Sequence, residues 1–126
     1  MTTPEEMRDR LRSFALTLPE AHEAEPWGES VVKVRNKIFL FLGTDGAPDP
    51  GFGVKLPESH EEALALPGIT PSGYGLGKAG WVSVTLPAGE AADPERYLEW
   101  VQESYRAVAP KRLVHALDAR NDVHPG

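Results

Sequence analysis

Apolar side chains recur at intervals of three or four residues in two segments, which is the spacing of a helix that buries one face. The first segment precedes Pro19 and places on one stripe Met7, Leu11, Phe14 and Leu18. The second precedes Pro110 and places on one stripe Leu98, Val101, Tyr105 and Val108. Proline cannot continue a helix, so each of these prolines marks a predicted end. At the two starts, the predicted caps are Thr3, paired with Glu6 in a capping box, and Asp93.

Other segments have the two-residue period of strands. Residues 30–42, SVVKVRNKIFLFL, predict two strands joined by a turn at Asn36-Lys37, with Lys33 and Arg35 on one face of the first strand. FGVKL at 52–56 predicts a third strand. WVSVTL at 81–86 predicts a fourth, with one side formed by Trp81, Ser83 and Thr85. Between them a short helix is expected over 58–66, with a capping box formed by Ser59 and Glu62.

The order helix, strands, helix, strand, helix predicts an α+β fold in a single domain. We expect an antiparallel sheet of about four to six strands with the long helices packed on one face. The domain is expected to span residues 1–118, followed by a C-terminal tail at 119–126. The residues predicted to be buried are Val32, Val34, Phe39, Phe41, Val101 and Tyr105.

Composition describes an ordinary globular chain of 126 residues, 40% hydrophobic and 25% charged. The chain has no cysteine, which excludes disulfides and thiolate chemistry. Its first residues, MTTPEEMRDR, lack the pattern of a signal peptide, and no apolar run is long enough to span a membrane, so a cytoplasmic location without a membrane partner is expected. The net charge of −6 argues mildly against a generic polyanion binder.

A glycine-rich stretch, GYGLGKAGW at 73–81, contains a formal match to the nucleotide-binding pattern G-x-G-x-x-G. A dinucleotide site needs a strand before the glycines and a helix after them, whereas here a strand follows. A protein-kinase loop does lie between strands, but the chain lacks the Asp-Phe-Gly motif and the catalytic loop. We therefore interpret the stretch as a turn that positions Tyr74, Lys78 and Trp81.

The order and spacing of several pieces resemble the MmcQ/YjbR family of small proteins with a CyaY-like, or frataxin-like, fold. The pieces are LTLPEAHEAEPWGE, VVKVRNKIFLFL, GVKLPE, PSGYGLGKAGWVSVTL and WVQESYRAVAPKRL, which together span nearly the whole chain. The resemblance implies the CyaY-like fold and DNA binding through a "double wing" arrangement of hairpins. The glycines around the Tyr, Lys and Trp are more numerous here than in the family's usual pattern.

Basic residues cluster locally although the whole chain is acidic. The residues predicted to contact the phosphates of double-stranded DNA are Lys33, Arg35, Lys37, Lys55 and Lys78. Lysines on a strand edge also serve simply to prevent edge-to-edge pairing. The alternative function is a protein-interaction or small-ligand module that uses a rim formed by Tyr74 and Trp81. The identity of a ligand or protein partner and the oligomeric state stay open.

The sequence offers little support for catalysis, metals or cofactors, and we expect none of them. The histidines His22, His60, His115 and His124 have no metal-ligand spacing. Acidic residues on the first helix, Glu5, Glu6 and Asp9, suit a helix N-terminus without any iron. The serines Ser30, Ser83 and Ser104 stand in no recognisable nucleophile motif. Trp100 is the aromatic residue that the helical pattern places at the margin of the core.

Overall fold

A computed structural model describes residues 4–25, 29–43, 51–72, 79–85 and 94–122. Within these ranges the helices are α1 (Pro4–Ala15), α2 (His60–Leu64), α3 (Pro94–Val108) and α4 (Lys111–Asp122). The strands are β1 (Ala21–Ala24), β2 (Ser30–Val34), β3 (Lys37–Gly43), β4 (Gly51–Lys55), β5 (Ile69–Pro71) and β6 (Trp81–Thr85).

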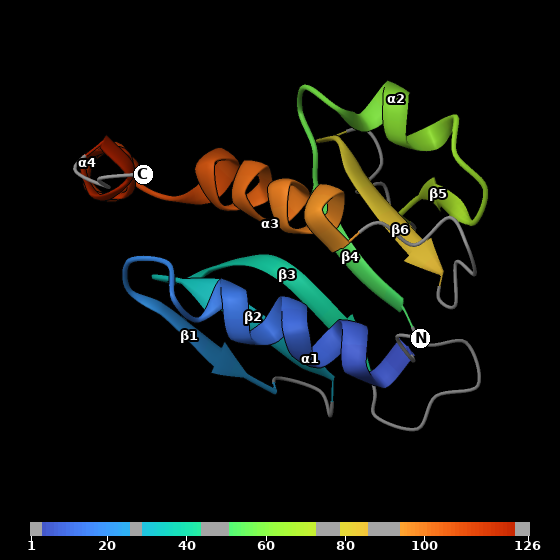
Figure 1. The fold of residues 1–126 in the computed structure, drawn as a ribbon, viewed down its shortest axis with the longest axis horizontal. Helices are drawn as coiled ribbons and strands as arrows, with labels where there is room; N and C mark the ends of the chain where they lie inside the picture. Colours follow the sequence, from blue (N-terminus) through green and yellow to red (C-terminus); the bar gives the residue numbers. More distant parts are fainter. Residues whose placement is uncertain (1–3, 26–28, 44–50, 73–78, 86–93, 123–126) are drawn as a thin grey trace.

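The six strands form one sheet in the order β1-β2-β3-β4-β6-β5, and every neighbouring pair is antiparallel. Figure 1 shows α1 and α3 side by side across one face of this sheet, and both helices contact β3 and β4. The first four strands form a meander, and β6 then inserts between β4 and β5. The predicted single α+β domain, with its helices on one face of an antiparallel sheet, is confirmed.

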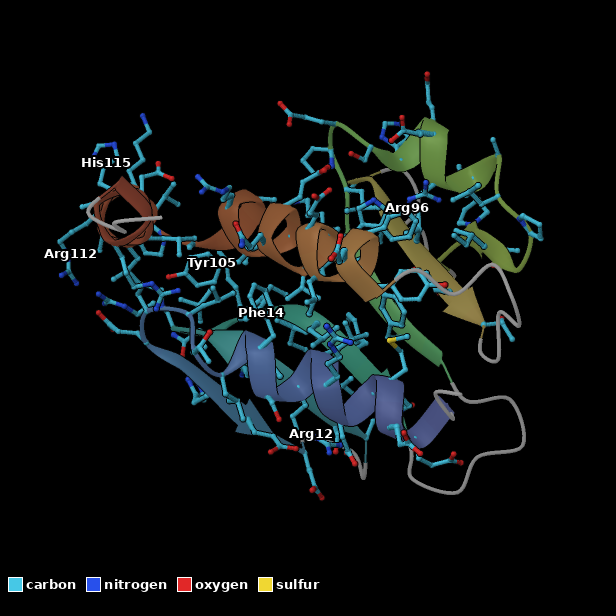
Figure 2. The ribbon with its side chains drawn as sticks, in the orientation of Figure 1. Arg12, Phe14, Arg96, Tyr105, Arg112 and His115 are labelled. Atoms are coloured by element: carbon cyan, nitrogen blue, oxygen red, sulfur yellow. The ribbon has the colours of Figure 1, made fainter. Side chains whose placement is uncertain are left out.

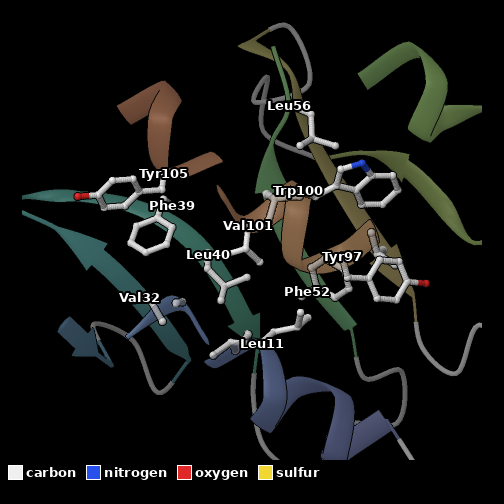
Figure 3. Packing of buried hydrophobic residues seen from close by; sticks show 14 of the residues in the cluster. Leu11, Val32, Phe39, Leu40, Phe52, Leu56, Tyr97, Trp100, Val101 and Tyr105 are labelled. Carbon is white, nitrogen blue, oxygen red and sulfur yellow. The ribbon is translucent and has the colours of Figure 1, made fainter. Parts of the chain in front are cut away.

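The core lies between the sheet and the two long helices. Leu40 pairs with Val32 on one side and Val54 on the other, so these three side chains share the face that the helices cover. Aromatic pairs complete the layer, as Figure 3 shows: Phe39 meets Tyr105 edge to face, and Phe52 meets Tyr97. The predicted burial is confirmed for Val32, Val34, Phe39, Val101 and Tyr105.

Two predicted burial states need correction. Phe41 was expected in the core but is half-buried, because its cross-strand partners Val31 and Gly53 place it on the face opposite the helices. Trp100 was expected at the margin but is buried in the core, where its ring packs 5.7 Å from that of Tyr97. Helical spacing alone does not fix the width of the buried face, which depends on the neighbouring elements.

The turn between β2 and β3 also differs from the prediction. Val34 pairs with Lys37, so the two turn residues are Arg35 and Asn36, one position earlier than expected. Arg35 has a φ of 57°, in the left-handed region, and it does not continue the strand. Lys33 and Arg35 therefore do not share a strand face, and that part of the prediction is wrong.

Local patterns missed two short strands and predicted one capping box that does not form. The sequence pattern predicted no strand at β1, which has four residues, or at β5, which has only three. α2 is shorter than the predicted 58–66, and the Ser59 side chain makes no cap hydrogen bond, so the capping box with Glu62 is wrong. α4 continues past residue 118, after which a C-terminal tail was expected, and ends at Asp122. The predicted caps Thr3 and Asp93 lie outside the described residues.

Each helix within the described ranges is too short or too polar to span a membrane.

Candidate functional site

The sheet opens between β3 and β4. Among the described residues these strands pair at Leu40 with Val54 and at Phe41 with Gly53, and Figure 1 shows them diverging on either side of α3. The buried Ser104 of α3 bridges the opening: its hydroxyl donates to the carbonyl oxygen of Phe39 at 2.6 Å and accepts from the Lys55 backbone N–H at 2.8 Å. One side chain thereby satisfies two backbone groups that the divergence of the strands separates.

A groove of about 400 Å³ lies at this opening. Its apolar lining consists of Ile38, Phe41 and Trp81 from the sheet, which we call the floor, and of Ala107 and Val108 near the end of α3, which we call the inner wall. Its rim carries Asn36, Lys37 and Lys55. A second hollow of about 370 Å³ shares the Asn36–Lys37 rim and the α3 wall and extends to Arg35 and Pro110. We call the two together the cationic groove, because none of the described residues that line it is acidic and three are basic.

The floor of the cationic groove is aromatic. The rings of Phe41 and Trp81 meet edge to face, with centroids 5.2 Å apart. Trp81 is only 8% exposed, whereas Phe41 is half-buried and presents more of its surface to the groove. Trp81 begins β6 opposite Lys55, and Gly80 before it has a φ of 94° while its carbonyl oxygen accepts from the Leu56 N–H at 2.8 Å. Glycine is the residue that adopts this conformation without steric cost.

The predicted lysines border the groove unequally. Lys37 and Lys55 line it, the first exposed and the second half-buried. Lys33 does not line it, but its cross-strand partner Ile38 does, so Lys33 lies on the adjoining part of the same sheet face. None of these three ammonium groups has an ion-pair partner among the residues that the structure describes. They are therefore available to an anionic ligand.

Arg35 is placed differently, because Glu20 binds it. Their side chains lie 2.9 Å apart from Nε to Oε1, and Glu20 also meets Arg112 of α4 at 3.3 Å. Both Glu20 and Arg35 have a positive φ, 59° and 57°, which is uncommon for residues with a side chain. Figure 2 shows Arg112 and Tyr105 at this end of the molecule, and the Tyr105 hydroxyl donates to the carbonyl oxygen of Pro19 at 2.8 Å. Arg35 lines the groove, but its guanidinium already forms an ion pair with Glu20.

Tyr74 and Lys78, predicted to lie beside Trp81, fall outside the described residues. The flanks of their segment are described: β5 precedes it, β6 follows it, and the Ser72 N–H donates to the Trp81 carbonyl oxygen at 3.0 Å. The strand β6 is thus the element described after the glycines, whereas a dinucleotide site requires a helix there. Phe41 and Asn36 were missed as candidate site residues, although an aromatic residue next to a basic hairpin was a signal that could have identified Phe41.

Two of the candidate serines and one carboxylate of α4 have structural partners. The Ser104 hydroxyl is engaged with backbone groups, and the Ser83 hydroxyl lies 3.0 Å from that of Ser72. Among the described residues, no group of three or more His, Asp or Glu side chains could hold a metal ion. Burial raises the pKa of Tyr105, and the nearby Glu20 raises it further. A hydrogen bond from Arg106 lowers the pKa of Asp118 and links α3 to α4.

Comparison with known proteins agrees with the resemblance in the sequence. A search of curated proteins found no significant match. A protein-family profile described as YjbR matches residues 16–107. The matched segment begins just after α1 and ends within α3, so it contains the whole described sheet and the residues that line the cationic groove up to Ala107. This chain is a member of the YjbR family.

Proposed function

We propose that the protein binds DNA without enzymatic activity, using the cationic groove and the adjoining Lys33 to contact phosphates. The observation that carries the proposal is the sign of the groove's charge. The whole chain has a net charge of −6, yet the described residues that line the groove include Arg35, Lys37 and Lys55 and no carboxylate. The MmcQ/YjbR resemblance implies the same activity.

A local cationic surface is sufficient for phosphate binding in an acidic protein. Each phosphate contact releases about one condensed counterion, so the gain depends on the cations that reach the backbone and not on the total charge. Screening limits the repulsion from distant carboxylates to a Debye length of about 10 Å at 0.1 M salt. Lys37 projects from the start of β3 and Lys55 from the end of β4, so the two charges sit on different sides of the opening. Binding of this kind would be weakly sequence-specific.

The alternative, a small-ligand or protein-interaction module, predicts a deep apolar pocket beside Trp81 or a large self-complementary sheet face. The hollow beside Trp81 is instead an open groove with lysines on its rim. Lysines that have no ion-pair partner in the described part of the chain favour an extended anionic partner over an enclosed apolar ligand. The long side chains of Lys37 and Lys55 can follow a phosphate backbone, whereas burying them around an apolar ligand would be costly.

The proposal is tested by titrating a fluorescein-labelled 20-base-pair duplex with the protein and recording anisotropy at two salt concentrations. We expect binding at 20 mM salt that weakens steeply by 200 mM. With about four phosphate contacts, the slope of log K against log salt should be near −3 to −4. Absence of binding at 20 mM salt, where electrostatic attraction is least screened, contradicts the proposal.

A further inference from the structure

We infer that the cationic groove accepts one unpaired nucleotide, with its base on the Phe41–Trp81 floor and the neighbouring phosphates at Lys37 and Lys55. The ligand class is therefore single-stranded nucleic acid, in preference to the duplex. This inference rests on the proposed function and makes it more specific, because phosphate contacts alone do not require an aromatic floor.

The floor is the first reason. Ile38, Phe41 and Trp81 give the groove an apolar surface, and Lys37 and Lys55 line the same groove. In a duplex the bases are stacked and paired, so a cationic surface of this size meets phosphates and sugars. A single strand presents bases whose flat faces stack on aromatic side chains. An aromatic floor flanked by cations is thus complementary to a base and its two phosphates.

The dimensions and the polar groups agree with this occupant. A volume of about 400 Å³ lies in the range of pockets that hold small organic groups, which is about 300–1,000 Å³. The rim residue Asn36 is exposed, and its amide offers both a donor and an acceptor to the edge of a base. No lining carboxylate among the described residues would repel the phosphates.

The groove is also fixed in shape before a ligand arrives. Ser104 ties β3 to β4 at the opening through its two backbone hydrogen bonds. Trp81 is held beneath Phe41 by its edge-to-face contact and by the β4–β6 register. Since the aromatic floor does not need to be assembled on binding, little ordering cost opposes the entry of a base.

The experiment compares three labelled ligands of one sequence at 50 mM salt: a 12-nucleotide single strand, its duplex, and the single strand with abasic sites throughout. The proteins are the natural chain, Phe41→Leu, and Leu16→Ala as an apolar control at an exposed position just after α1. We expect the single strand to bind about tenfold more tightly than the duplex and the abasic strand to lose about tenfold, because stacking of each base on an aromatic ring contributes on this scale. Phe41→Leu should lose the same factor for the single strand only, and Leu16→Ala should lose nothing.

The outcomes separate the inference from the proposed function. Equal or tighter binding of the duplex, or an abasic strand bound as well as the normal strand, overturns the inference while DNA binding stands. No binding of any ligand overturns both. The abasic comparison uses the natural chain, so it decides the question even if Phe41→Leu fails to fold.

Discussion

The hydroxyl of Ser104 donates a 2.6 Å hydrogen bond to the carbonyl oxygen of Phe39, and this contact holds α3 in the opening between β3 and β4. The same oxygen accepts from the backbone N–H of Lys55, so both edges of the cationic groove depend on one buried side chain. The groove forms where β3 and β4 separate beyond their pairing at Leu40 and Val54. Ser104 provides hydrogen-bond partners for the backbone groups at this separation.

Ser104→Ala is expected to lower the free energy of unfolding by about 2–4 kcal/mol, because it leaves two buried backbone groups without a partner. Urea denaturation followed by circular dichroism measures the change. Ser13→Ala, at an exposed position in α1, is the matched control and should change stability by less than about 0.5 kcal/mol. Equal effects of the two variants would show that the bridge contributes nothing.

Glu103 of α3 caps α2 from a distance. Its carboxylate accepts the backbone N–H groups of Glu58 and Ser59, both at 3.0 Å, and the Ser59 hydroxyl at 2.7 Å. Glu103→Ala should destabilise the protein by about 1–2 kcal/mol, the usual effect of losing a helix cap. Glu62→Ala, which removes the acceptor that the sequence pattern predicted, should change stability by less than about 0.5 kcal/mol. If Glu62→Ala destabilised the protein more than Glu103→Ala in thermal or urea unfolding, the local capping box would be supported instead.

The Glu103 cap illustrates which features the sequence could predict. The amphipathic periods of α1 and α3 and the alternation in β2, β3 and β6 determine the fold class, because each buried stripe must find a partner face. Ser59 and Glu62 have the spacing of a capping box, yet the acceptor comes from a residue 44 positions later in the chain. Such a contact depends on tertiary packing, which no local pattern contains.

The sequence likewise predicted only those parts of the candidate site that depend on local patterns. Lys37 and Lys55 were identified because basic residues cluster along the chain, and Trp81 because it follows the glycines. Phe41 was assigned to the core, since a run of apolar residues does not show where a bulge exchanges the two faces of a strand. The ladder between β2 and β3 is shifted on both sides of the Val31–Val32 step, and this irregularity sets the face of Phe41.

Glu20→Gln is expected to strengthen DNA binding, because it releases Arg35 and Arg112 from their shared ion pair. Affinity should rise several-fold at low salt, and the log–log salt slope should steepen by about one to two units. Glu61→Gln, at an exposed site on α2, changes the net charge equally and is the control. Identical effects of both variants would mean that only net charge matters and that Arg35 does not reach the ligand.

Tyr105→Phe should lower the free energy of unfolding at pH 7 by about 1 kcal/mol, because the hydroxyl no longer donates to Pro19. Burial raises the pKa of Tyr105 above its ordinary value of 10.0, so its stabilising contribution is complete below that pH and is lost as the pH rises through the higher folded value. The stability gap between the natural chain and the variant should therefore narrow above pH 10. Urea titrations at pH 7 and at two pH values above 10 test this. A difference in unfolding free energy between the two proteins that widens above pH 10 contradicts a stabilising role for the Tyr105 hydrogen bond to Pro19.

The most direct test of phosphate binding by the groove is the salt dependence of duplex binding for Lys37→Ala/Lys55→Ala. Losing two phosphate contacts should flatten the log–log slope by about two units relative to the natural chain. The charge-matched control is Arg10→Ala/Lys111→Ala, two exposed cations on α1 and α4 that do not line the groove, and it should keep the natural slope. An unchanged slope in the Lys37/Lys55 variant, or equal flattening in both variants, would contradict the assignment of DNA binding to this groove.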